Sequence, residues 1–231
     1  MKKRINKIKI LRIIHTLNPA HGGPQNAIID NSLSLIKNGI SVDILTSDIR
    51  NYHFKKIKNL RIINKGPSLN DYGLNFKLFY WLLKNKKKYR FILIHGIWQF
   101  YTLAARILFK NKYFVFIHGQ LDPFFALNLI KKIKKKLYWF LIEKGNLISS
   151  KSLLLTSNLE KKLIAKTYVD TIELKKIVIN YGIAKPNFNK KRVVEVFYKK
   201  FPKLKNKKFL LFLGRFHEKK GCDVLIKALK K

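Results

Sequence analysis

Two adjacent glycines and a proline form a corner of the chain whose chemistry would suit a phosphate or a hydroxyl group. Gly22, Gly23 and Pro24 join an apolar, strand-like stretch to an amphipathic, helix-like stretch. Glycine lets a ligand approach the backbone, and proline suits the first position of a helix. The free N–H groups and the positive end of such a helix attract phosphate. The spacing is neither G-x-G-x-x-G nor a Walker loop, so a simple tight turn remains the alternative.

Other polar segments follow apolar runs in the same way. HGIWQ (residues 95–99) and HGQLDPF (118–124) each come at the end of a nearly continuous apolar run, and NYG (180–182) follows another. LGRFHEKKG (213–221) follows the apolar run that begins at residue 209. Because ligands of open α/β sheets bind at the carboxyl ends of the strands, we expect these segments to gather along one rim.

The elements that must position these segments are short apolar runs that alternate with amphipathic stretches. The patterns predict strands at 8–17, 42–46, 60–63, 91–96, 113–119, 153–156 and 177–180, and helices at 25–37, 76–84 and 129–144. Ser157 and Glu160 have the spacing of a capping box at a further helix start. Strands apolar on both faces indicate a parallel sheet covered by helices. The predicted fold class is therefore α/β, with a Rossmann-like, doubly wound parallel sheet.

The composition of the sequence becomes more polar and basic after Gly182, which predicts a domain boundary. We expect an N-terminal Rossmann-like domain at 1–184 and a polar, basic linker with one short helix at 185–208. A fresh strand (209–214) and the start of a helix then open a second unit at 209–231. One strand and one helix cannot bury their own apolar faces, so this second domain is predicted to be incomplete.

Composition bounds the class of protein. The 231 residues are 47% hydrophobic, which is typical of a globular chain, and the single cysteine, Cys222, excludes an internal disulfide and fits a reducing compartment. No signal peptide and no apolar run of the ~20 residues needed for a membrane span is present, so we expect a cytoplasmic protein. The net charge of +38 comes mostly from lysines spread along the chain, without RNP-type aromatic motifs. It indicates either a nucleic-acid binder or the codon bias of a genome rich in A and T. In either case, a basic surface with interspersed aromatic residues would be drawn to anionic lipid head groups.

The ordered set of motifs resembles the glycosyltransferase family 4 (group 1) enzymes of the GT-B fold. The motifs are Gly-Gly-Pro, His-Gly-x-Trp, Gly-x-Leu-Asp-Pro and Leu-Gly-Arg-x-x-x-Lys-Lys-Gly, and they run over nearly the whole chain. The chain looks most like members that build surface polysaccharides such as lipopolysaccharide. The resemblance implies hexosyl transfer from a nucleotide-diphosphate sugar to a lipid-linked or polysaccharide acceptor, with retention of configuration and with no metal or other cofactor.

The resemblance also implies roles for residues that bind the donor. Gly22 and Gly23 would lie against the donor phosphates or an acceptor hydroxyl. His118 would be the catalytic histidine that contacts the transferred sugar, since a neutral imidazole can bind a hydroxyl beside a developing positive charge. Arg215 and Lys220 would bind the diphosphate and stabilise the charge on the leaving group.

Three further residues are candidates for the acceptor or the sugar, each with a structural alternative. His95 could bind a hydroxyl or could be a satisfied histidine at a strand end. Trp98 could stack on a sugar ring or pack in the core. Asp122 could hold acceptor hydroxyls or make a turn before Pro123. His15 we expect in the core, and His21 in an exposed loop.

One departure from the family pattern affects the expected activity. The sequence contains no pair of glutamates separated by seven residues and no segment matching the base and ribose pocket. We therefore expect a truncated chain with weak donor affinity and little transfer by itself. The rival hypotheses are a non-catalytic remnant that binds sugar or the inner face of a membrane, and a nucleic-acid binder that acts through charge alone; we expect no specific nucleic acid.

Overall fold

The computed structural model describes residues 8–21, 23–49, 59–123, 129–168, 171–180, 182, 188–214 and 216–230. The chain divides into two compact units, residues 1–183 and 184–231, and each is described by itself. The sequence predicted a domain end at 184 and a linker up to 208; the division into these functional domains stays a prediction.

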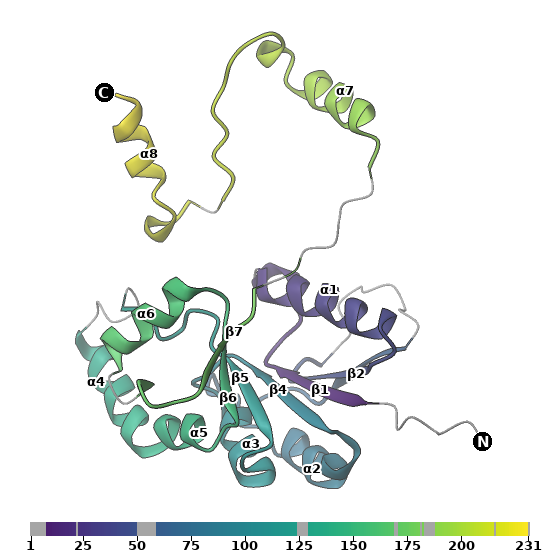
Figure 1. The fold of residues 1–231 in the computed structure, drawn as a ribbon, viewed down its shortest axis with the longest axis vertical. Coiled ribbons are helices and arrows are strands. Elements are labelled where there is room, and N and C mark those ends of the chain that lie inside the picture. Colours follow the sequence, from purple (N-terminus) through teal and green to yellow (C-terminus); the bar gives the residue numbers. More distant parts are fainter. Residues whose placement is uncertain are drawn as a thin grey trace. The chain divides into compact units, whose positions relative to one another are not determined.

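The first unit is built on a seven-stranded sheet with the order β3-β2-β1-β4-β5-β6-β7 (Figure 1). All six strand pairs are parallel. The strands are β1 (Lys9–Ile14), β2 (Ser41–Thr46), β3 (Leu60–Asn64), β4 (Phe91–His95), β5 (Tyr113–Phe116), β6 (Ser152–Leu155) and β7 (Lys176–Val178). Every predicted strand of this unit is present, and the predicted α/β, Rossmann-like fold class is confirmed.

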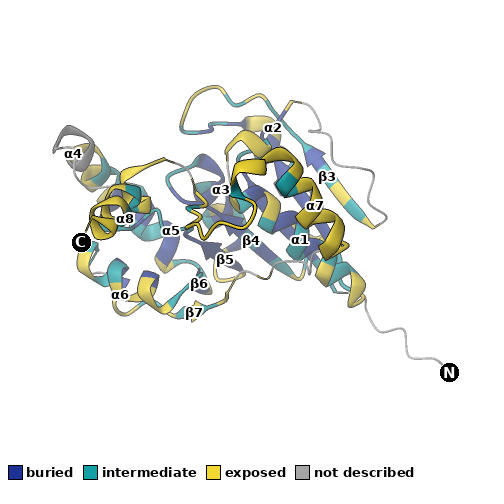
Figure 2. Ribbon diagram, turned by 90° about the horizontal axis from the view of Figure 1, so that it is seen from above, coloured by how far each residue is buried: buried dark blue, intermediate teal, exposed yellow. Residues whose placement is uncertain are grey.

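Helices cover both faces of this sheet. They are α1 (Gly23–Lys37), α2 (Phe76–Asn85), α3 (Phe100–Phe109), α4 (Leu129–Tyr138), α5 (Lys144–Ile148) and α6 (Asn158–Thr167). In Figure 1, α2, α3 and α5 lie below the sheet and α1 lies above it. Successive residues of a strand point to opposite faces, so Ile13 joins the larger core cluster and Ile14 joins the smaller cluster under α1. Figure 2 shows the central strands β4 and β5 as largely buried, whereas the edge strand β3 is partly exposed.

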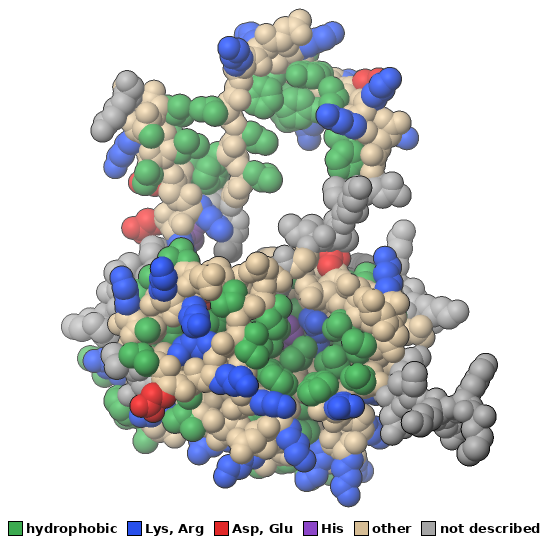
Figure 3. Space-filling model, in the orientation of Figure 1, with side chains coloured by type: hydrophobic (Ala, Val, Ile, Leu, Met, Phe, Trp, Pro, Cys, Tyr) green, Lys and Arg blue, Asp and Glu red, His purple; other side chains and the backbone are tan. Residues whose placement is uncertain are grey.

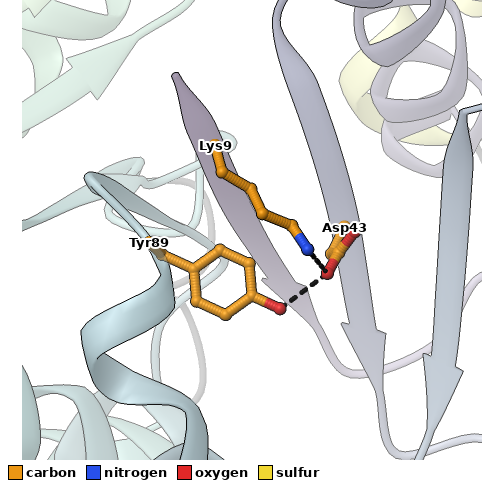
Figure 4. A network of polar contacts seen from close by, with 3 residues as sticks. All are labelled: Lys9, Asp43 and Tyr89. Atoms are coloured by element: carbon orange, nitrogen blue, oxygen red, sulfur yellow. Dashed lines mark hydrogen bonds and ion pairs between the residues drawn. The ribbon is translucent and has the colours of Figure 1, made fainter. Parts of the chain in front are cut away.

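An ion pair between a partly exposed lysine and a buried aspartate fixes the amino-terminal edge of the central strands (Figure 4). The Lys9 ammonium lies 2.8 Å from an Asp43 carboxylate oxygen, and the Tyr89 hydroxyl donates to the same oxygen at 2.6 Å. Burial, together with the hydrogen bond to Asp43, raises the pKa of Tyr89, so this hydroxyl keeps its proton. The contact ties the chain before β4 to β1 and β2.

One helix prediction needed correction, and one helix was missed. The predicted helix at 129–144 is interrupted, because α4 passes through a π-helical turn at Trp139–Glu143 before α5 begins. The helix α3 was not predicted, because its apolar residues form an almost continuous run from Phe100 to Phe109 in which no polar face marks the 3.6-residue period. None of the helices in the described ranges is both long and apolar enough to cross a bilayer.

The predicted strand at 209–214 is wrong. Residues 207–213 form no strand, and Leu213 is 92% exposed. The described part of the second unit holds the helices α7 (Lys190–Lys200) and α8 (Cys222–Leu229), and neither helix buries a residue. A strand needs a neighbour to pair its N–H and C=O groups, and this unit offers none among its described residues.

Candidate active site

Two histidines meet at the carboxyl ends of the central strands. His95 is the last residue of β4, and His118 follows β5. The His95 Nδ1 and His118 Nε2 atoms are 3.1 Å apart, so one ring donates a hydrogen bond to the other. Both rings stack on Phe116, with centroid distances of 5.1 Å for His95 and 5.6 Å for His118. The structure thus brings two of the predicted site residues into direct contact.

Both imidazoles are neutral near pH 7. Burial lowers the pKa of His95 well below its usual value, and the positive charge of Arg12 lowers it further. Burial, followed by the same Arg12 charge, lowers the pKa of His118 to about 4. Arg12 lies within β1 and is only 5% exposed. A neutral imidazole can accept a proton or bind a hydroxyl, which is the state that the predicted role of His118 requires.

The backbone at His118 is held in an uncommon conformation. His118 and Gly119 have φ angles of +53° and +73°, a left-handed pair that is unfavourable for histidine. The Gly119 N–H donates to Glu160 Oε1 at 2.7 Å. Glu160 Oε2 accepts from the Thr156 N–H at 2.6 Å and from the Thr156 hydroxyl at 2.8 Å. Glu160 therefore joins the loop after β5 to the loop after β6 and fixes the turn that carries His118.

This arrangement corrects the predicted capping box. The Ser157 hydroxyl does accept from the Glu160 N–H, at 3.1 Å, as an N-cap should. The Glu160 carboxylate, however, bonds Thr156 and Gly119 rather than the N–H of Ser157. A local sequence pattern predicted the cap, but the use of the carboxylate depends on a loop 41 residues away.

The loop after β4 interlocks with the loop that carries His118. Ile97 N–H donates to Gln120 Oε1 at 2.6 Å, and Gly96 N–H donates to the Phe116 carbonyl at 2.8 Å. The Tyr101 hydroxyl donates to the His95 carbonyl at 2.8 Å. Gly96 has a φ of +96°, and a side-chain carbon there would lie 3.0 Å from the Tyr101 hydroxyl, so the turn requires glycine.

Trp98 and Asp122 lie in the loops after β4 and β5, and their contacts fit their structural alternatives. The Trp98 ring packs against the rings of Tyr138, Trp139 and Tyr168 at centroid distances of 5.8 to 6.1 Å. The Asp122 N–H donates to the Gly119 carbonyl at 3.1 Å, which closes a turn. Their roles toward a sugar remain predictions.

The remaining predicted site residues are not brought to the histidine pair by described contacts. Gly23 begins α1 after β1, on the same carboxyl edge of the sheet, and a side-chain carbon at this position would meet no atom within 4 Å. Gly22 and Arg215 lie outside the described residues. Lys220 is exposed in a short 3₁₀ turn of the second unit, whose position relative to the first is not defined.

Sequence reasoning missed a pocket beside these loops. It has a volume of about 760 Å³ and lies where β1 and β2 end. His15, predicted to be a core residue, lines this pocket, and burial lowers its pKa. His21 is exposed, as predicted. The sequence did contain a signal for this pocket. Asp48 follows a strand and Asp71 lies in a loop, and acidic residues are rare in this chain, which has only 12.

Comparison with known proteins places this architecture in a class. No family model matches the chain, and no curated protein matches its sequence. Among solved structures, sucrose-phosphate synthase from Thermosynechococcus elongatus is 18% identical with a TM-score of 0.66 and is matched over 96% of this chain and 59% of its own. A glycosyltransferase from Rickettsia africae ESF-5 gives 20% identity, a TM-score of 0.65 and coverages of 97% and 57%.

A third similar structure is WaaG, a glycosyltransferase involved in lipopolysaccharide biosynthesis. It is 16% identical with a TM-score of 0.59 and coverages of 95% of this chain and 58% of its own. The chain thus has the fold of GT-B glycosyltransferases, as its motifs predicted, and spans less than two thirds of the length of these three structures.

Proposed function

We propose that this chain takes part in the transfer of a hexose from a nucleotide-diphosphate sugar to a glycan or lipid-linked acceptor. The observation that carries the proposal is a neutral, hydrogen-bonded His118, held on a left-handed turn at the carboxyl rim of a sheet with a glycosyltransferase fold. The GT-B neighbours are consistent with a nucleotide-sugar donor and a glycan acceptor in general.

In the proposed reaction the first unit holds the acceptor, and cationic side chains bind the donor diphosphate. The bond between the anomeric carbon and the diphosphate breaks, the acceptor oxygen bonds to that carbon, and the acceptor hydroxyl passes its proton to the departing diphosphate oxygen. A neutral His118 binds a hydroxyl of the transferred sugar without adding positive charge next to the developing oxocarbenium ion. Arg215 and Lys220 meet the negative charge of the leaving diphosphate, so the proposed transfer is metal-independent, and we propose retention of configuration.

The test is sugar transfer by the full chain with a panel of radiolabelled nucleotide sugars and glycolipid acceptors. We expect slow transfer that His118→Ala reduces by at least about 100-fold, because a group acting on charge that develops in the transition state typically has effects of that size. His21→Ala is the matched control, since His21 is an exposed loop histidine. Equal rates for His118→Ala and the wild type would remove His118 from the site, and no transfer from any donor would favour the non-catalytic alternative.

A second candidate function, contact with anionic lipid, is favoured by the surface of α4 and the turn after it. Four large apolar side chains there are 61% to 69% exposed, namely Ile133, Leu137, Phe140 and Leu141. Their spacing places them on one helical face, and the exposed Lys134 and Lys136 flank them. An amphipathic face of this kind inserts its apolar side chains at the membrane interface while its lysines bind anionic head groups. We propose peripheral attachment to the inner face of a membrane.

Vesicle sedimentation tests this proposal. The chain should pellet with vesicles that contain phosphatidylglycerol and not with pure phosphatidylcholine, and added salt should reduce the pelleted fraction. Replacing Phe140 and Leu141 with serine should lower the pelleted fraction at low and at high salt, because salt does not screen the apolar contribution to vesicle binding. The control is Ile107→Ser, which removes a 60% exposed residue from α3. Absence of pelleting at low salt would contradict the proposal.

A further inference from the structure

The pocket at the ends of β1 and β2 has the form of a small-molecule site. Its volume of about 760 Å³ falls within the range of roughly 300–1,000 Å³ that ligand sites show. It is lined by His15, Ser47, Asp48, Ile49, Pro67, Ser68, Leu69, Asn70, Asp71 and Gln99. These residues come from the ends of β1 and β2, from the segment between β3 and α2, and from the residue before α3. The pocket therefore opens on the same carboxyl edge of the sheet as His95 and His118.

Hydrogen bonds fix the segments that form the walls of this pocket. Asp48 accepts from the Thr16 hydroxyl at 2.5 Å and from the Leu17 N–H at 2.8 Å, which ties the end of β2 to the loop after β1. Gln99 Nε2 donates to the Asp71 carbonyl at 3.2 Å. Gly73 has a φ of +79°, and a side-chain carbon there would meet Gln99 Oε1 at 2.6 Å. The loop can thus pack against Gln99 only with glycine at this position.

The charge of the lining distinguishes this pocket from the rest of the surface. Lysine and arginine side chains are spread over the visible face of the molecule in Figure 3, and the chain carries 50 of them. None is among the ten lining residues within the described part of the chain, whereas Asp48 and Asp71 are. Burial lowers the pKa of His15, so this imidazole adds no positive charge at neutral pH. The described lining residues therefore supply two carboxylates and no cation.

We propose that this pocket binds an uncharged or amino-bearing sugar and disfavours a phosphorylated one. The inference rests on the proposed function, because the sugar would be the acceptor of the transfer. Carboxylate, amide and hydroxyl groups pair with sugar hydroxyls, and carboxylates also pair with an ammonium group. The exposed side chains of Ile49 and Leu69 add apolar contact for the C–H face of a pyranose ring. A phosphate in the same place would face two like charges, which weakens binding.

The test uses three probes of similar shape and different charge, namely methyl glucoside, glucosamine and glucose 6-phosphate. Each is titrated at millimolar concentrations into the ¹⁵N-labelled full chain, and the amide shifts of Ser47, Asp48 and Gln99 are followed. We expect these amides to shift with glucosamine and with methyl glucoside, and glucose 6-phosphate to bind at least about fivefold more weakly than glucosamine. Moderate salt suppresses binding of the phosphate to lysines elsewhere.

A charge-neutral variant sharpens this test. Asp71→Asn should weaken the binding of glucosamine by about threefold or more and leave the binding of methyl glucoside nearly unchanged. The reason is that only the ammonium group of glucosamine depends on the carboxylate charge. Glu173→Gln, which removes one charge from an exposed residue before β7, should change neither. Tighter binding of glucose 6-phosphate at the pocket amides, or no shift with any of the three sugars, would overturn the inference. The binding measurements do not depend on the transfer assay. If sugar transfer fails but the pocket amides shift as expected, the proposed function is contradicted and the pocket inference stands.

Discussion

Glu160→Ala is expected to lower the free energy of unfolding of the first unit by about 3 kcal/mol, because it removes an acceptor shared by three donors. The Glu160 carboxylate accepts from Gly119 N–H, Thr156 N–H and the Thr156 hydroxyl, and the residue is only 9% exposed. Without it, two backbone donors lose their partners in a partly buried region. The left-handed turn at His118 then loses its main tie to the neighbouring strand loop.

Urea unfolding followed by tryptophan fluorescence measures this change for the first unit alone. The chain has three tryptophans, and all of them lie before residue 184. Glu160→Gln should give an intermediate loss, because its amide oxygen keeps one acceptor and its NH₂ group faces a donor. Glu173→Ala, at an exposed glutamate, should change stability by less than about 0.5 kcal/mol. Losses of equal size at Glu160 and Glu173 would contradict the assigned role.

Glu143→Gln is expected to make the first unit more stable above neutral pH, by up to about 3 kcal/mol. Glu143 is fully buried in the π-helical turn, and burial raises its pKa from 4.5 to about 7 against the opposing effects of Asn146, the Trp98 N–H and Tyr138. The folded protein therefore binds this proton more tightly than the unfolded chain does. Stability from protonated Glu143 is fully present below pH 4.5 and is lost as pH rises to about 7.

The measurement is the difference in unfolding free energy between Glu143→Gln and the wild type from pH 4 to pH 8. The difference should be near zero at the acid end, grow through the window between 4.5 and about 7, and then level off. His95 and His118 also titrate in acid, but they do so in both proteins and cancel in the difference. A Glu143→Gln curve parallel to the wild type would show that this carboxyl is ionised in the folded protein.

The predicted site is partly assembled in the structure and partly still a prediction. His95 and His118 meet although they are 23 residues apart in the chain, because β4 and β5 are neighbours and both histidines follow buried runs. Trp98 and Asp122 make packing and turn contacts that suit their structural alternatives. The donor contacts of Arg215 and Lys220 stay predictions.

The sequence alone determined the parallel sheet and the edge at which its loops gather. Runs apolar on both faces and separated by amphipathic helices permit a covered parallel sheet, and in such a sheet all loops after the strands meet at one edge. It did not determine which side chains meet there, because hydrogen bonds between loops depend on strand order and on side-chain direction. Glu160 followed a local capping pattern, yet its carboxylate bonds Gly119. The segment at 209–213 has the pattern of a strand, but a strand forms only where a neighbour can accept its backbone hydrogen bonds.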